Sequence, residues 1–192
     1  MWKNFVIMWR KRVLIKKKYF IIYAIILIAG LTFGVNPCLK IVYPIHYEEY
    51  VMKYSKEYNV DPYLVFSIIK AESKFFPYAE SNREAKGLMQ ISTITQQWAQ
   101  DELQIGDINI FNPETNVQIG CWYISKLFKQ FNDKDLVIAA YNGGSGNVDK
   151  WLKDQRYSEN GINLYKIPFK ETSDYVNKVN KYYKRYKAIY EK

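Results

Sequence analysis

Residues 61–73 read DPYLVFSIIKAES, and this stretch decides the fold. Asp61 followed by Pro62 is a strong helix-start signal, because the aspartate side chain caps free backbone N–H groups and proline fits the first helical turn. Apolar side chains then cover nearly every side of the predicted helix: Tyr63, Leu64, Val65, Phe66, Ile68 and Ile69. A helix that lacks a polar face belongs in the centre of a domain. The stretch therefore predicts a buried central helix.

Glu72 stands in the last turn of this predicted helix, since Pro77 allows little continuation beyond it. The helix dipole and burial both disfavour a carboxylate anion at that position, so we expect a raised pKa. A carboxylic acid that keeps its proton near neutral pH can act as a general acid. From this segment alone, the alternative is a glutamate that simply emerges into solvent at a helix end.

The rest of the chain beyond the first 46 residues shows further helical patterns. Asn112-Pro113-Glu114 is a strong cap sequence for a long helix, and Ser145 after two glycines is expected to cap a short one. No alternating strand pattern and no phosphate-binding glycine-rich loop occurs. Besides the central helix, we expect helices over about residues 47–58, from 93, over 112–131, 135–142 and 145–152, and from 170 onward. The sequence thus predicts a mainly α, multi-helix domain.

The net charge of +9, with a sequence pI near 9.3, would by itself favour a nucleic-acid-binding protein. Residues 1–18, however, contain seven Lys or Arg and no Asp or Glu, which leaves a net charge of +2 for the other 174 residues. Residues 19–35, YFIIYAIILIAGLTFGV, are uncharged and would form a helix of about 25 Å, at the short end of what spans a bilayer core. Basic residues before such a span indicate a cytoplasmic N-terminus, so the argument for nucleic acid loses most of its support.

We therefore expect a basic cytoplasmic tail over 1–18, a single N-terminal transmembrane helix over 19–35, a linker over 36–45 and an extracytoplasmic domain over 46–192. The main alternative is a cleaved signal peptide, but this apolar segment is longer than the usual ~7–15 residues and no A-x-A-like site follows it. A lipid-modified Cys38 would need small residues before it, where Asn and Pro stand.

Cysteine and histidine usage excludes several chemistries. Cys38 and Cys121 have neither C-x-x-C nor zinc-site spacing, and they are compatible with one disulfide or with two separate thiols. His46 is the sole histidine, so an H-E-x-x-H metal site is impossible and a Ser-His-Asp or Cys-His site would have to use it. We expect no metal and no cofactor. An enzyme of this composition must work with carboxylates, hydroxyls and amides.

Four ordered blocks of sequence carry a resemblance to a known family. They are IIKAESKFFPYAESNREAKGLMQIS (68–92), NPETNVQIGCWYISKL (112–127), AAYNGGSGNVDKWL (139–152) and IPFKETSDYVNKV (167–179). Together they strongly resemble the catalytic domain of the soluble lytic transglycosylase family, over about residues 47–187. The resemblance implies a lysozyme-like fold and cleavage of the β-1,4 bond between N-acetylmuramic acid and N-acetylglucosamine in peptidoglycan, with a 1,6-anhydro sugar as product.

The resemblance also implies roles for individual residues. Glu72 matches the catalytic Glu of the family's E-S dipeptide. The residues matched to substrate binding are Ser73, Ser81, Met89, Gln90, Tyr141, Asn142, Glu171 and Tyr175. By their own pattern, Met89 and Tyr175 also fit a plain core. This chain departs from the family where it carries Glu84 in place of a frequent Gly and Ser145 in place of a frequent Pro, and the first departure puts the loop conformation in doubt.

One carboxylic acid suffices for this reaction if the substrate supplies the nucleophile, whereas ordinary glycosidases use two carboxylates. The nearest alternative is a hydrolytic muramidase of goose-lysozyme type, in which Glu80, Glu84 or Asp101 would hold a water. A non-catalytic peptidoglycan-binding protein and a membrane-tethered DNA binder, with a helix-turn-helix at Gly143-Gly144, are weaker alternatives.

The expected partners are peptidoglycan glycan strands and, through the N-terminal helix, the cell membrane, with no nucleic acid. Cell-wall or secretion machinery is also compatible with the sequence, which does not choose among physiological roles.

Overall fold

The structure is a computed structural model that describes residue 2, residues 18–24 and residues 39–191. The chain divides into two compact units, residues 1–44 and residues 45–192. In the first unit, residues 18–24 and 39–42 are helical. Residues 25–35 of the predicted transmembrane helix, most of the basic tail and Cys38 lie outside the described residues. Within the described ranges, no helix is both long and apolar enough to cross a membrane.

The second unit is built from helices, which confirms the mainly α prediction. No strand occurs among residues 45–191, where isolated bridges join Glu80 to Lys86 and Lys86 to Ile91. The helices are α2 (Glu48–Tyr58), α3 (Pro62–Glu72), α4 (Thr93–Leu103), α5 (Pro113–Phe131), α6 (Lys134–Gly143), α7 (Ser145–Leu152) and α8 (Lys170–Tyr190).

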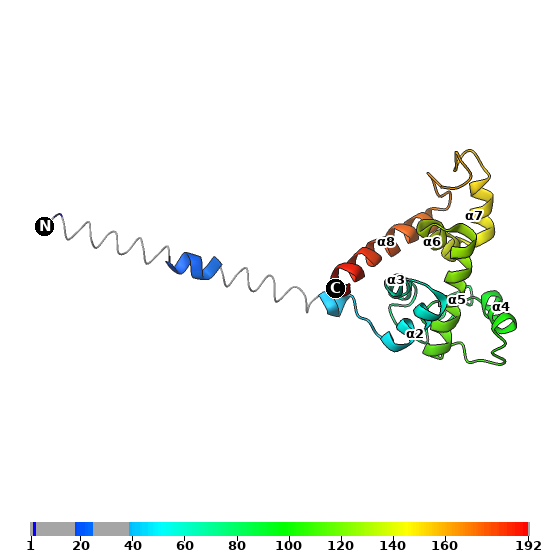
Figure 1. The fold of residues 1–192 in the computed structure, drawn as a ribbon, viewed down its shortest axis with the longest axis horizontal. Helices are drawn as coiled ribbons and strands as arrows, with labels where there is room; N and C mark the ends of the chain where they lie inside the picture. Colours follow the sequence, from blue (N-terminus) through cyan, green and yellow to red (C-terminus); the bar gives the residue numbers. More distant parts are fainter. Residues whose placement is uncertain (1, 3–17, 25–38, 192) are drawn as a thin grey trace. The chain divides into compact units, whose positions relative to one another are not determined.

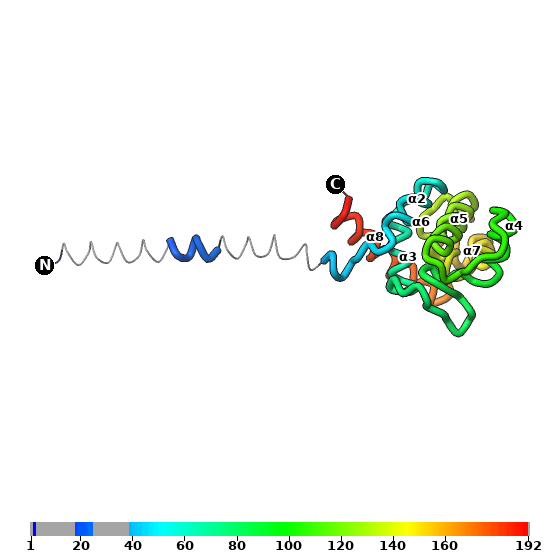
Figure 2. The backbone as a smooth tube through the Cα atoms, turned by 90° about the horizontal axis from the view of Figure 1, so that it is seen from below, coloured from blue at the N-terminus to red at the C-terminus, as the bar shows by residue number. Residues whose placement is uncertain are grey.

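The α3 helix is the centre of this unit, as its sequence predicts. It packs against α2 and α8, while α5 contacts α2, α4 and α6, and α8 also packs on α6 (Figures 1 and 2). Six consecutive residues of α3, 64–69, are all buried. The one hydroxyl among them, on Ser67, donates a 2.6 Å hydrogen bond to the carbonyl of Tyr63, so burial leaves no polar group of this side chain unsatisfied.

Both ends of α3 are fixed by local sequence. Asp61 caps the N-terminus by accepting a 2.8 Å hydrogen bond from the backbone N–H of Tyr63. The helix ends at Glu72 because the chain reverses there, with Lys74 and Phe75 in the left-handed region at φ +52° and +69°. Phe75 is buried against the rings of His46 and Phe66, and this burial offsets the cost of a conformation that side chains disfavour.

The start of α7 differs from the sequence-based prediction. Ser145 does not cap α7: it is the first residue of that helix, and Gly144 precedes it with φ +87° and no side-chain cap. Glycine takes the corner because residues with a Cβ rarely adopt that φ. Cys121 is a free, buried thiol.

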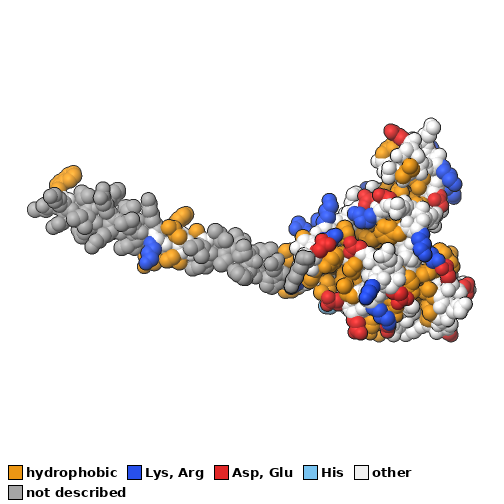
Figure 3. Space-filling view, viewed as in Figure 1, with side chains coloured by type: hydrophobic (Ala, Val, Ile, Leu, Met, Phe, Trp, Pro, Cys, Tyr) orange, Lys and Arg blue, Asp and Glu red, His pale blue; other side chains and the backbone are white. Residues whose placement is uncertain are grey.

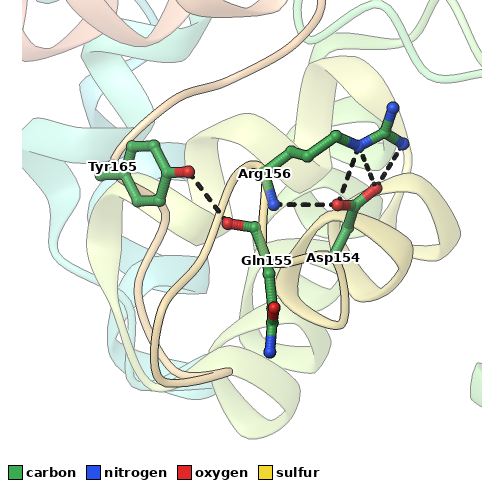
Figure 4. Close-up of polar contacts among 4 residues, drawn as sticks. All are labelled: Asp154, Gln155, Arg156 and Tyr165. Carbon is green, nitrogen blue, oxygen red and sulfur yellow. Dashed lines mark hydrogen bonds and ion pairs between the residues drawn. The ribbon is translucent and has the colours of Figure 1, made fainter.

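Local polar contacts hold the long loop between α7 and α8. In this loop, Asp154 accepts hydrogen bonds from the backbone and the guanidinium of Arg156, and Tyr165 Oη donates to the carbonyl of Gln155 at 3.0 Å (Figure 4). On the face visible in Figure 3, positive and negative side chains are interspersed over the second unit.

The cap at Asp61 should contribute measurably to stability. Asp61 also accepts a 2.6 Å hydrogen bond from Tyr183 Oη and so ties the start of α3 to α8. We expect Asp61→Ala to lower the free energy of unfolding by about 1–2 kcal/mol, measured by urea denaturation. Asp61→Asn, which retains a capping oxygen, should recover most of the loss. Equal stability of the alanine variant and the wild type would contradict this account.

Candidate active site

Glu72 is the last residue of α3, and its carboxylate is largely withdrawn from solvent. Its Oε1 accepts a 2.6 Å hydrogen bond from Tyr175 Oη of α8. Burial raises the pKa of Glu72 from 4.5 to about 6 and the charge of Glu171 adds to the rise, while the Tyr175 hydrogen bond and the charge of Lys178 oppose it. The raised pKa expected from the sequence is confirmed, and Glu72 is not a glutamate that emerges freely into solvent.

A pocket of about 440 Å³ opens beside Glu72. Six of the residues predicted for the site line it: Glu72, Ser81, Gln90, Tyr141, Asn142 and Glu171. An adjoining pocket of about 320 Å³ shares Glu72, Asn142 and Glu171 with the first, and Tyr175 and Lys178 line it as well. The structure therefore brings seven of the nine predicted residues together, from α3, α6, α8 and the segment between α3 and α4.

Two further hollows extend this site into a cleft. One of about 330 Å³ runs along Gln90, Tyr141 and Gly144, and one of about 500 Å³ reaches toward Phe169. Asn142 lines all four pockets, which therefore lie around this residue. A larger pocket of about 710 Å³ lies between the start of α6 and the loop before α8, and Glu72 does not line it.

The G-L-M-Q loop, residues 87–90, is held against the cleft by hydrogen bonds to its backbone. Ser73 Oγ donates to the carbonyl of Leu88 at 2.7 Å, and Tyr141 Oη donates to the carbonyl of Met89 at the same distance. The Gln90 amide nitrogen donates to the carbonyls of Ala79 and Gly87, each at 3.0 Å. Several predicted site residues thus build the loop as well as line the cleft.

Asn116 of α5 is a buried residue that sequence reasoning did not single out. Its Oδ1 accepts from the N–H of Met89 at 2.8 Å, and its Nδ2 donates to the carbonyls of Lys86 and Ile110 at 3.0 and 2.9 Å. A Cβ on Gly87 would lie 2.2 Å from this Nδ2, so only glycine fits there. The sole sign of Asn116 in the sequence was its position one turn after the start of the Asn-Pro-Glu cap.

Two predicted substrate-binding residues do not line the cleft pockets. The Met89 side chain is fully buried, and it occupies the space that a side chain on Gly120 would need, with Met89 Sδ 2.1 Å from that Cβ position. Ser73 faces the loop carbonyl that it binds. Met89 is therefore core rather than a surface for substrate, because the loop turns its side chain toward α5, and Ser73 supports the loop.

Glu84, where the family frequently has Gly, lies in a turn that suits glycine. Glu84 adopts φ +59°, a conformation that glycine takes most easily, which accounts for the glycine frequent in the resembling family. Ser81 accepts hydrogen bonds from the N–H groups of Arg83 and Ala85 at 3.3 and 3.1 Å, and its carbonyl accepts from Glu84. These bonds hold the turn in place.

The carboxylates near Glu72 differ from those expected for a muramidase. Neither pocket that contains Glu72 is lined by Glu80, Glu84 or Asp101. Glu80 instead pairs with Lys86 at 3.7 Å, and Asp101 is exposed on α4. The acids that do share a pocket with Glu72 are Glu171 and Asp174, one turn apart on α8. In the described part of the chain, no group of three or more His, Cys, Asp or Glu residues is arranged to hold a metal ion.

With this geometry established, comparison with known proteins identifies the family. The Transglycosylase SLT domain matches residues 49–163, more than half of the chain. The chain belongs to the SLT domain family. The match covers α2 to α7 and includes Glu72, Asn116 and Asn142, while α8, which supplies Tyr175, lies beyond it.

The relatives of this SLT domain are larger proteins. The soluble lytic murein transglycosylase of Salmonella typhimurium is 31% identical over 146 residues, which cover 73% of this chain and 23% of that protein. The membrane-bound lytic murein transglycosylase C of Pectobacterium atrosepticum is 31% identical over 166 residues, with 71% and 45% covered. An inactive mutant of the lytic transglycosylase Slt from Pseudomonas aeruginosa superimposes with a TM-score of 0.68 at 30% identity, over 78% of this chain and 25% of that one.

The chain thus spans less than half of the length of these relatives. The structural match supports the lysozyme-like fold inferred for the SLT domain, as does the likeness to the 70-kDa soluble lytic transglycosylase of Escherichia coli.

The Tyr175 hydroxyl should set how readily Glu72 loses its proton. Because its hydrogen bond favours the carboxylate, Tyr175→Phe should raise the pKa of Glu72 further above its value of about 6. NMR titration of the Glu72 carboxyl carbon would measure the change. Tyr165→Phe, in the exposed loop before α8, serves as the control. An unchanged or lowered pKa in the Tyr175 variant would refute this role.

Proposed function

We propose that this chain is a peptidoglycan lytic transglycosylase that cleaves the β-1,4 bond between N-acetylmuramic acid and N-acetylglucosamine and leaves a 1,6-anhydro end. The observation that carries the proposal is the state of Glu72. Its pKa of about 6 and its place on the cleft suit an acid that gives and takes a proton within one catalytic cycle. The names of the relatives, which are lytic murein transglycosylases, support the same substrate class.

In the first step, protonated Glu72 donates its proton to the glycosidic oxygen as the bond to the anomeric carbon breaks. The leaving N-acetylglucosamine thereby gains a free hydroxyl. The N-acetyl group of the muramyl sugar stabilises the oxocarbenium-like centre that remains, so the substrate takes the place of a second protein carboxylate. Tyr175 holds Oε1 of Glu72 throughout, which leaves Oε2 for proton transfer.

In the second step, the Glu72 carboxylate accepts the proton of the muramyl C6 hydroxyl while the C6 oxygen attacks the anomeric carbon. This closes the 1,6-anhydro ring and returns Glu72 to its protonated form, so no water is consumed. Intramolecular attack gains from the high effective concentration of the hydroxyl. Lys178, on the same pocket, offsets the charge that Glu72 carries between the two steps. Asn142, at the junction of the cleft pockets, is placed to bind acetamido groups.

Digestion of purified sacculi tests both the product and the acid. We expect anhydro-muropeptides in the mass spectrum, whereas reducing-end products would favour a muramidase that uses Glu171 or Asp174. Glu72→Gln should reduce the rate by about 10²–10⁴-fold. Full lytic activity in that variant would exclude Glu72 as the acid.

The same variant has a stability signature that separates lost chemistry from lost folding. The folded-state pKa of about 6 exceeds the ordinary 4.5, so the folded protein binds the proton more tightly and its stability falls as pH rises from about 4.5 to about 6. The Glu72→Gln variant should lack this fall and be more stable than the wild type at pH 7 by about 2 kcal/mol. Unfolding in urea at pH 4 and pH 7 measures the difference.

We also propose that residues 19–35 anchor the chain in the cell membrane, with the N-terminus in the cytoplasm and the SLT domain outside. The support is the seven basic residues of 1–18 followed by 17 uncharged residues. Such an anchor would hold the cleft close to the wall polymer on which the enzyme acts.

Reporter fusions after the last residue test this topology. Alkaline phosphatase should be active in the fusion and a cytoplasm-dependent fluorescent reporter inactive. Replacement of the basic residues of 1–18 by neutral ones should weaken this orientation. The opposite pattern of reporter activity would refute the placement.

A further inference from the structure

The C-terminal half of α8 carries a concentration of positive charge. Residues 175–190 contain five Lys or Arg and no Asp or Glu. Lys181, Lys184 and Arg185 are exposed, and no carboxylate of the described residues forms an ion pair with any of them. Residues three and four apart are neighbours on a helix surface, so these three side chains share one face of α8. We call this face the α8 basic surface.

Three acids beside this half of α8 do not neutralise the surface, because they pair with other lysines. Asp61 and Glu191 both lie close to Lys187, with their oxygens 4.0 and 2.9 Å from its Nζ. On the side toward α6, Asp135 pairs with Lys134 at 3.5 Å. The positive charge of the α8 basic surface is therefore available to an external partner.

The end of α3 adds further positive charge. Lys70 Nζ lies 5.3 Å from the centre of the Tyr182 ring on α8. Burial, together with the charge of Lys74, lowers the pKa of Lys70. Lys74 itself is exposed in the turn that follows α3. Two helices that pack against each other thus present positive charge in one region of the domain.

The last turns of α8 lie where the chain enters the second unit. Lys187 contacts Asp61, the residue directly before α3. At Tyr190, burial and then the charge of Glu48 raise the pKa of the hydroxyl, which places the end of α8 near the first residue of α2. The second unit begins at Ile45, only three residues before Glu48. The α8 basic surface therefore belongs to the side of the domain at which residue 45 arrives.

The length of chain before Ile45 limits how far this side can move from a membrane. Residues 36–44 separate the proposed anchor from the second unit, and nine residues span at most about 32 Å when fully extended. This span is no more than the diameter of a domain of this size. A short connection of this kind gives the domain a high effective concentration at the lipid surface. Phosphate headgroups attract Lys and Arg there, over a distance of about 10 Å at 0.1 M salt.

We propose that the α8 basic surface binds the anionic phosphate headgroups of the membrane in which the chain is anchored. The proposal rests on the anchor of the proposed function, because the short connection brings the surface within reach of the lipid. Lys178, which lines a pocket with Glu72, lies one turn before this surface on α8. Docking of α8 on the bilayer therefore holds the cleft at a fixed height and favours cleavage of glycan strands that lie next to the membrane.

Fluorescence quenching in the full-length chain tests this contact. In a Cys38→Ser background, where Cys121 is buried, a label is attached through Ala188→Cys on the exposed face of α8. The chain is reconstituted into vesicles of phosphatidylcholine alone or mixed with phosphatidylglycerol, and the neutral quencher acrylamide is added outside. We expect less quenching in the anionic vesicles, and recovery at 1 M salt, where the Debye length is about 3 Å. A label attached through Gln97→Cys on α4, which packs against α5, should be quenched equally in both.

Two triple variants with the same loss of charge show whether α8 makes the contact. One neutralises the α8 basic surface: Lys181→Gln, Lys184→Gln and Arg185→Gln. The control neutralises three exposed lysines on or next to α5 and α7: Lys129→Gln, Lys150→Gln and Lys153→Gln. The first variant should lower the ratio of docked to free domain by about a hundredfold and abolish the shielding of the label, whereas the control should retain it. Urea unfolding checks that both variants keep the fold.

Extraction of the vesicles at alkaline pH tests the anchor separately, because an inserted chain stays with the lipid. If the chain resists extraction and the label on α8 is quenched equally in neutral and anionic vesicles, the α8 basic surface is refuted and the anchor stands. Shielding that persists in the α8 triple variant also overturns the proposal, since the contact would then come from charge elsewhere in the domain. If the chain is extracted, the anchor fails and the α8 proposal fails with it.

Discussion

The hydrogen bond from Tyr175 to Glu72 is the interaction on which the site depends. A largely buried carboxyl group at the end of a helix with a buried centre is costly to ionise, and a partner is needed to keep the charged form accessible. Tyr175 supplies it from 103 residues further along the chain. The packing of α8 against α3 that stabilises the core therefore also sets the proton affinity of the acid. The interface between α3 and α8 thus contributes both to the stability of the fold and to the pKa of Glu72.

Around that acid, polar side chains act mainly on the backbone of the loop after α3. Tyr141 of α6, Asn116 of α5 and Ser73, directly after α3, each bind a backbone group of residues 86–89. A loop held from three sides loses little freedom when substrate arrives, so binding energy is available for the reacting bond. This arrangement suits a glycosidase, whose acid must stand at a fixed distance from one oxygen atom.

The features that sequence alone predicted are those that local chemistry determines. The cap at Asp61, the all-apolar α3 and the acid in its last turn can be read within 13 residues, because each depends on neighbours along the chain. Asn116 could not be recognised in this way, since its three partners belong to segments that only the fold brings together. Met89 matched the substrate-binding loop by motif and also fitted a plain core by its own pattern; it is buried, and the motif could not decide because motif position does not give side-chain direction. Glu80, one of three acids named for the muramidase alternative, pairs with Lys86, and its position in the sequence gave no sign of that contact.

The contact between Met89 and Gly120 has a consequence for how this site can vary. The sulfur of Met89 fills the volume that any side chain at position 120 would need. The two residues therefore share one fixed space, and a larger side chain at one position requires a smaller one at the other or a shift of the loop toward the cleft. Substitutions at these two positions are therefore expected to be coupled, and the depth of the cleft depends on the pair and not on either residue alone.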